Sequence, residues 1–307
     1  MTFVYRVSPR LASLAASAAV AAAASLSSGS IEPAQAQAKN SAKAAPATVE
    51  QADAAREAAS WRFRQAPGWL MTVKAHVVGS PRFTGSDEYS VIAYPTISIR
   101  RNDGPEKFGA PDDGISFVVF GDAHWAVGVV GRYQGGRYYD QDRRLYGIRD
   151  AKWSVEPGLF GEFWALTDTV RMRGEMRYGI NGYNGLIGSV ALDYVHRMGP
   201  RLVLNAGPRM TVAGSEYMDA YFGVTAQDAA WNASVTPYSP GAGVKSIGVA
   251  AAATYRWNDQ WSTTVRGQYD RLVGPAGDSP IVRNIGSRDQ FTFGASASYT
   301  FPLGYAP

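Results

Sequence analysis

The sequence of 307 residues has no cysteine and only three histidines. Without cysteine there can be no disulfide bond, no cysteine-ligated metal and no thiol nucleophile. Charged residues make up 18%, whereas a water-soluble domain usually has about a quarter. The mean hydropathy is nevertheless slightly negative, which excludes a helical membrane protein. A chain that is apolar at alternate residues would combine these two properties, because its apolar and polar faces cancel in the average.

The N-terminal region has the three parts of a signal peptide. Arg6 and Arg10 precede a run of Ala, Ser, Leu and Val at 11–26, and Ala36-Gln37-Ala38 follows as a small-x-small cleavage site. Alanine is too weakly hydrophobic, and the run too short, for a membrane anchor. We therefore expect residues 1–38 to be a signal peptide, cleaved after Ala38. Residues 39–60 are polar and Ala-rich, and we expect a periplasmic leader there, with partner contact as the alternative role.

From Trp61 onward the hydrophobic pattern has a period of two. In the segment 169–180, apolar residues such as Met172 and Met176 alternate with charged ones such as Arg173 and Arg177. On a strand these become one apolar and one charged face, whereas a helix would scatter them. The same alternation recurs at 260–272 and 290–301. Their length suits tilted strands that cross a bilayer.

Further strands are expected at 68–78, 89–101, 115–120, 123–134, 152–166, 185–198, 201–213 and 244–257. With the three above they make eleven, and 216–223 could be a short twelfth. Tight turns at 166–169, 198–201 and 257–261 contrast with long polar connections at 135–150, 214–243 and 273–288.

In lipid an apolar-faced sheet must close on itself, and single-chain bacterial barrels have an even strand count. We expect an all-β fold over 61–307, an antiparallel transmembrane β-barrel of about 12 strands (10–12) in the outer membrane of a Gram-negative cell. A soluble lipocalin-like barrel or sandwich is the alternative.

Motifs of catalysis and cofactor binding are absent. There is no G-x-S-x-G elbow, no His-Glu metal motif and no phosphate-binding glycine loop. The three histidines are far apart, and His76 and His196 are interpreted as interior hydrogen-bonding residues. Asp112-Asp113 lacks the spacing of a calcium loop and is interpreted as a solvated acidic pair. We therefore expect no enzyme activity, no cofactor and no metal, and the small net charge of +4 gives no case for nucleic acid.

The charged residues that alternate with the apolar ones would point into the barrel, and they suggest how its interior is filled. The predicted lumen-facing charges are Arg171, Arg173, Glu175 and Arg177, with Arg201 and Arg209 on equivalent parities. They could line an anion-preferring pore, or ion pairs could fill the interior. We favour the second interpretation, because buried charges need partners.

Two motifs resemble the MipA/OmpV family (MltA-interacting protein): Tyr221-Phe222-Gly223-Val224-Thr225 and Asp278-Ser279-Pro280-Ile281-Val282. Similar segments begin at Pro81, Gly131, Tyr238 and Tyr269, so that the likeness covers about 68–301. The resemblance implies a non-enzymatic outer-membrane barrel that contacts lipid. In one branch it implies a scaffold that joins a murein lytic transglycosylase to a penicillin-binding synthase. A passive pore for small, including anionic, solutes and a surface antigen or adhesin are the alternatives. The family offers no catalytic residues, and the role of the motif loops is left open.

Overall fold

The computed structural model describes residues 5–7, 68–102 and 108–303. The expected signal peptide at 1–38, apart from 5–7, and the expected leader at 39–60 lie outside the described residues. Within the described part, no helix is both long enough and apolar enough to cross a membrane.

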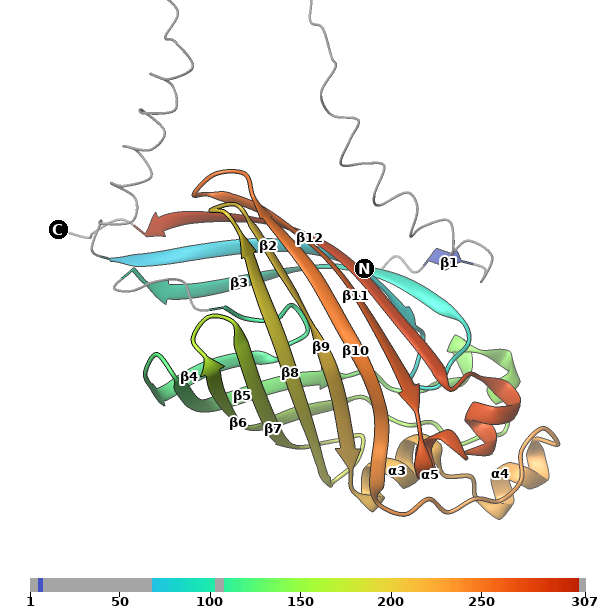
Figure 1. Cartoon of the computed structure of the whole chain (residues 1–307). Helices are drawn as coiled ribbons and strands as arrows, with labels where there is room; N and C mark the ends of the chain where they lie inside the picture. Colours follow the sequence, from blue (N-terminus) through green and yellow to red (C-terminus); the bar gives the residue numbers. More distant parts are fainter. Residues whose placement is uncertain (1–4, 8–67, 103–107, 304–307) are drawn as a thin grey trace, which may run out of the picture.

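The fold is one curled antiparallel sheet, seen along its length in Figure 1. The strand order is β1-β3-β2-β12-β11-β10-β9-β8-β7-β6-β5-β4. The strands are β1 (Tyr5–Val7), β2 (Trp69–Pro81), β3 (Tyr89–Arg101), β4 (Ile115–Gly121), β5 (Trp125–Gln134), β6 (Ser154–Leu166), β7 (Val170–Tyr178), β8 (Leu186–Met198), β9 (Leu202–Ala213), β10 (Gly243–Arg256), β11 (Trp261–Leu272) and β12 (Asp289–Leu303).

The eleven predicted strands are confirmed as β2 to β12, each within three residues at either end. The possible twelfth strand at 216–223 is wrong, because this segment forms helix α3 (Ser215–Phe222). Tyr217, Met218, Tyr221 and Phe222 are all buried, and their spacing places them on one side of a helix. A strand would send half of these four side chains to the opposite face.

Alternation of side chains gives the sheet an apolar convex face and a polar concave face. Along β7, Arg171, Arg173 and Glu175 are buried, whereas Met172 and Met176 are exposed. The convex face also exposes aromatic and aliphatic residues of every neighbouring strand, including Leu159, Tyr194, Val249 and Phe293. An outward apolar surface of this kind suits contact with lipid, and charged side chains would be costly on it.

The two ends of the sheet differ in their connections. At one end lie the short turns 122–124, 167–169, 199–201 and 257–260, together with the start of β2 and the end of β12. At the other end lie the long connections 82–88, 135–153, 179–185, 214–242 and 273–288. These carry the helical elements η1 (Tyr139–Gln141), η2 (Arg143–Leu145), α3, α4 (Ala226–Trp231), α5 (Gly274–Gly277) and η3 (Ile281–Ile285). We call the five long connections the loop cap, and its helices lie at the lower right of Figure 1.

The sheet is a barrel that stays open along one seam. In the described residues, β4 pairs only with β5, and the far side of β3 pairs only with the three residues of β1. Eleven alternating strands run from β3 to β4, so both strands point toward the short-turn end. Parallel neighbours require a connection back along the barrel. Here the chain leaves β3 at the short-turn end and enters β4 from the long-loop end.

Candidate functional site

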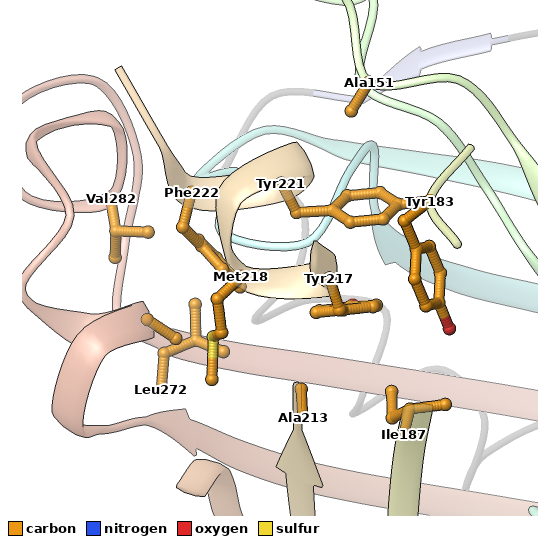
Figure 2. Packing of buried hydrophobic residues seen from close by; sticks show 11 residues of the cluster. Ala151, Tyr183, Ile187, Ala213, Tyr217, Met218, Tyr221, Phe222, Leu272 and Val282 are labelled. Atoms are coloured by element: carbon orange, nitrogen blue, oxygen red, sulfur yellow. The ribbon is translucent and has the colours of Figure 1, made fainter. Parts of the chain in front are cut away.

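The loop cap is held together by two hydrophobic clusters that draw on all five long connections. The first contains Ala151, Tyr183, Ile187, Ala213, Tyr217, Met218, Tyr221, Phe222, Leu272, Ala276 and Val282, most of which are labelled in Figure 2. The second contains Phe83, Leu145, Ile148, Val224, Val235, Ile281 and Ile285. Phe83 belongs to the β2–β3 connection and Leu145 to the β5–β6 connection, on opposite sides of the seam. Loops from across the barrel therefore meet over its mouth.

The two family-like motifs lie inside this cap and contact each other. Tyr221, Phe222, Gly223 and Val224 are buried at the end of α3, and Figure 2 shows Tyr221 and Phe222 pointing into the first cluster. Ser279 is also buried, and its hydroxyl donates a hydrogen bond of 2.7 Å to the carbonyl oxygen of Phe222.

The neighbours of Ser279 differ in exposure. Pro280 is buried, whereas Asp278 is exposed and pairs with Arg288 at 2.8 Å. Most motif side chains therefore form the interior of the cap, where they hold two long loops together.

Polar contacts tie the cap across the seam. Arg144, in the β5–β6 connection, pairs with Asp87 of the β2–β3 connection at 2.5 Å and with Asp142 at 2.7 Å. The buried Asn232, after α4, donates hydrogen bonds of 2.8 Å to the carbonyl oxygens of Arg144 and Tyr146. These contacts connect loops from both sides of the open seam, so the cap holds the two edges of the sheet together at this end. No sequence motif marked Asn232 or Arg144 for this role.

The inward charges of β7 form a dense ion-pair network with acids of neighbouring strands. Arg171 contacts Asp193 at 2.6 Å, Asp113 at 2.7 Å and Glu162 at 3.3 Å. Its side chain is completely buried. We call Arg171, Arg173, Glu175 and Arg177, with Arg209 and their acidic partners, the arginine network.

The remaining members of the network are paired in the same way. Arg173 contacts Glu175 at 3.0 Å, and its guanidinium lies 3.9 Å from the ring centre of Phe160. Arg177 pairs with Glu175 and, at 3.0 Å, with Glu156. The structure thus places all four predicted lumen-facing charges on the concave side, where they are buried by one another.

The partners Asp193, Glu162 and Glu156 were not singled out from the sequence. Their inward parity on β6 and β8 was the available signal, but only the strand pairing shows which arginine each one meets.

The connection before β4 folds into the interior and is held there by arginines. Asp112 accepts two hydrogen bonds from Arg209, of 2.7 and 3.1 Å, and Asp113 accepts two from Arg171, of 2.7 and 3.1 Å. The carbonyl oxygen of Pro111 accepts one from Arg266 at 2.8 Å. We call 108–114 the inner segment. The interpretation of Asp112-Asp113 as a solvated pair is therefore wrong, because arginines from distant strands converge on the two carboxylates.

Electrostatics at Asp112 follow from this contact. Burial by itself would raise the pKa of the carboxyl, but the hydrogen bonds and charge of Arg209 outweigh it and hold the pKa below its usual value. The inner segment is therefore anchored by an ionised aspartate at neutral pH.

The other half of the interior is hollow. A cavity of about 2390 Å³ lies along β2, β3, β11 and β12 and reaches the short-turn end at Gly68, Gly199 and Asn258. We call it the vestibule. Its charged wall residues are Lys74, Arg100, Asp112, Asp113, Arg132, Arg197, Arg256, Asp259 and Arg266. Cations thus outnumber carboxylates on the wall.

The histidines are not brought together. His76 lies on the vestibule wall, bonded to the hydroxyl of Thr96 at 2.9 Å, as expected for an interior residue. His196 is exposed and stacks against Tyr194 on the convex face, so its predicted interior position is wrong. On β8, His196 lies at two-residue spacing from Leu192 and Tyr194, so it shares their outward face. No group of three or more His, Asp or Glu side chains suited to a metal ion occurs in the residues that the structure describes.

A family model described as MltA-interacting protein MipA matches residues 73–301, which is most of the chain. The chain belongs to the MipA family. The match extends from β2 to β12 and so includes the loop cap, the inner segment and the arginine network. No curated protein matches the chain in sequence.

Solved outer-membrane proteins are similar to this MipA-family chain at a low level. The NanC porin shares 8% identity, with 76% of this chain and 99% of that chain covered and a TM-score of 0.37. The translocator domain of the autotransporter NalP from Neisseria meningitidis shares 13%, with coverages of 82% and 95% and a TM-score of 0.35. OmpT of Vibrio cholerae shares 10%, with coverages of 76% and 97% and a TM-score of 0.34. Such low values say nothing about the function of this chain.

Proposed function

We propose that this MipA-family barrel is a non-enzymatic scaffold of the outer membrane that presents its short-turn end to cell-wall enzymes in the periplasm. The observation that carries the proposal is the loop cap, whose buried family motifs cross one mouth of the barrel. A mouth filled by two hydrophobic clusters suits a structural role better than transport. In outer-membrane barrels the short turns face the periplasm and the long loops face outward. By that rule the cap lies outside and the vestibule opens toward the murein.

The proposed partners are a murein lytic transglycosylase, the class in the family description, and a penicillin-binding synthase. They would dock on the rim of short turns, where Arg201 is exposed and Asp259 is partly exposed. The short-turn end is favoured for docking because, at the loop cap, the motif residues are mostly buried and offer little surface to a partner.

The test is a pull-down of the full-length protein from detergent-solubilised envelopes. We expect recovery of a murein hydrolase or synthase, and a decrease of fivefold or more with the double variant Arg201→Glu, Asp259→Lys. The matched control is Arg143→Glu, which reverses an exposed charge in the loop cap and should leave recovery unchanged. Equal recovery with all variants, or no murein enzyme at all, would refute the scaffold.

A pore is the second candidate, and the size and cationic wall of the vestibule favour it. Single-channel recording in a planar bilayer separates the two. We expect little steady current from the capped barrel. Large, steady, anion-selective conductance that falls with Lys74→Glu, together with no recovered murein enzyme, would establish the pore instead.

A further inference from the structure

The two halves of the barrel interior differ in how many of their cationic side chains are paired with a carboxylate. Among the described residues, Arg171, Arg173, Arg177 and Arg209 each pair with at least one carboxylate within 4.0 Å. Lys74, Arg100 and Arg266, on the vestibule wall, have no carboxylate at that distance in the described part of the chain. Of the acids on the vestibule wall, Asp112 and Asp113 are already held by Arg209 and Arg171, and Asp259 lies in the β10–β11 turn at the opening. The vestibule thus has cations that its own acids do not neutralise.

Strand register places these cations on a common wall. Lys74 lies opposite Ser298 of β12, and Ser298 lies opposite Ser262 of β11. Arg266, four residues beyond Ser262, lies on the same inward parity. Neighbouring strands are about 4.8 Å apart and four residues along a strand span about 13 Å, so the Cα atoms of Lys74 and Arg266 lie about 16 Å apart. Because both side chains are long, their charged groups can approach one carboxylate that lies between them.

Gly294 allows Arg266 to lie across the wall. It is the residue opposite Arg266 on β12, and a Cβ there would come within 2.9 Å of the Arg266 Nε. With no side chain at this position, the guanidinium group can lie over β12, on the side toward β2. Arg266 also holds the carbonyl oxygen of Pro111, which gives it a fixed anchor.

The remainder of the wall is rich in hydroxyl groups. Pairs of hydroxyls bridge neighbouring strands at 2.8 Å (Thr72 and Thr300), 2.9 Å (Thr254 and Thr264) and 2.6 Å (Ser262 and Ser298). Each hydroxyl can donate and accept, so it can exchange its present partner for a ligand hydroxyl. Tyr94 stacks on His76 with ring centres 4.9 Å apart, and 38% of Tyr94 is exposed, which provides a flat apolar surface beside the cations.

We propose that the vestibule binds a hydroxylated organic anion of the sugar-acid class, with Lys74 and Arg266 on its carboxylate and the serine and threonine hydroxyls on its hydroxyl groups. Entry is from the short-turn end, because Gly68, Gly199 and Asn258 line the cavity there. At the other end the lining extends to Gln134, the last residue of β5, and includes no described residue of the loop cap. The proposal does not depend on the scaffold function, since it concerns a small molecule and a different part of the barrel.

The experiment is titration calorimetry of the full-length protein, folded in detergent at low salt, with sodium glucuronate, glucose and inorganic phosphate as probes. We expect glucuronate to bind at least tenfold more tightly than either glucose or phosphate, and its Kd to rise with added sodium chloride. Lys74→Gln and, separately, Arg266→Gln should each weaken glucuronate binding about tenfold. Lys152→Gln and Arg143→Gln are the matched controls, because they remove the same charges from exposed positions in the loop cap.

Two results would overturn the proposal. Equal binding of glucuronate and glucose would show that the cations do not contribute, and equal binding of phosphate would exclude the sugar-acid class. Unchanged affinity in either vestibule variant, with heat-modifiable mobility on a gel proving that the variant is folded, would exclude the assigned site. Two separate variants are used so that one folding failure leaves the test intact. A failed pull-down would leave these results unaffected.

Discussion

Arg171 illustrates how one residue of the barrel interior depends on several strands. Its guanidinium lies among Asp113, Asp193 and Glu162, which belong to the inner segment, β8 and β6. Burial of so many charges is tolerable because each has a partner of opposite sign. Removal of a single member leaves others uncompensated, so this network is sensitive to substitution.

The first prediction follows from this arrangement. Arg171→Gln should lower the free energy of unfolding by about 3–5 kcal/mol, since it leaves buried carboxylates without their cation. Arg143→Gln, at an exposed position of the loop cap, should change it by less than about 0.5 kcal/mol. Urea unfolding of the protein inserted in lipid vesicles measures both. A cost for Arg171→Gln no greater than that of the control would contradict the network.

The second prediction concerns the opposite face of the same strand. Met172 is 50% exposed on the convex side, so Met172→Arg should cost about 2–4 kcal/mol if the position is near the bilayer midplane. Met172→Leu keeps the apolar character and should cost less than about 1.5 kcal/mol. The same unfolding assay applies. Equal costs for the two variants would reject contact of this face with lipid.

At the scale of elements, the loop cap joins segments that are distant in sequence. The buried Ser279 hydroxyl donates to the carbonyl oxygen of Phe222, 57 residues away, and accepts from the Ile281 amide at 3.3 Å. Ser279→Ala should cost about 1–3 kcal/mol, because a buried carbonyl loses its donor. Ser234→Ala, at an exposed position of the same cap, is the control.

The loss of stability caused by Ser279→Ala should be confined to the loop cap. Faster hydrogen exchange at 273–288 and 214–242, with unchanged exchange in β7, is the expected result for Ser279→Ala. If exchange rose equally throughout the sheet, or nowhere, Ser279 would not be a link between the two loops.

The inner segment is expected to respond to acid. The lowered pKa of Asp112 means that its ion pair with Arg209 stabilises the folded state above the unfolded pKa of about 4. That stability is lost as the pH falls through the still lower pKa of the folded state. Asp112→Asn should therefore reduce stability at pH 7, and should flatten its decline below pH 4.

Unfolding of wild type and Asp112→Asn in vesicles at pH 7, 4 and 3 tests this linkage. The gap between the two proteins should narrow as the pH falls. A gap that stays constant from pH 7 to pH 3 would exclude Asp112 as an ionised anchor.

On the scale of the whole molecule, the mature chain is expected to begin at Lys39. Ala36-Gln37-Ala38 is the site that motivates this prediction, and N-terminal sequencing of the protein from membranes tests it. Cleavage there would remove Tyr5–Val7, the residues that pair with the outer edge of β3. Retention of Met1 or Thr2 would refute it.

Strand positions and faces were accessible from the sequence because they depend on local alternation. A residue on a strand has its face set by its neighbours at two-residue spacing, so Met172 and Arg173 could be assigned without knowledge of any partner. The eleven strands follow from the same periodicity and from the turn residues between them. Helix α3 is the exception, because eight residues are too few for the period alone to separate a helix from a short strand, and the surrounding cap decides which side chains are buried.

Partners across long separations came only from the tertiary structure. Arg209 meets Asp112 at a separation of 97 residues and Arg171 meets Asp113 at 58, distances over which no periodicity carries information. The division of the interior into a paired and a hollow half depends on the curvature that brings β6 to β9 toward the inner segment. The closing of one mouth by the loop cap likewise depends on where strands from both sides of the seam deliver their loops. Local pattern therefore indicates a barrel with charges inside, and three-dimensional packing selects which of those charges are neutralised.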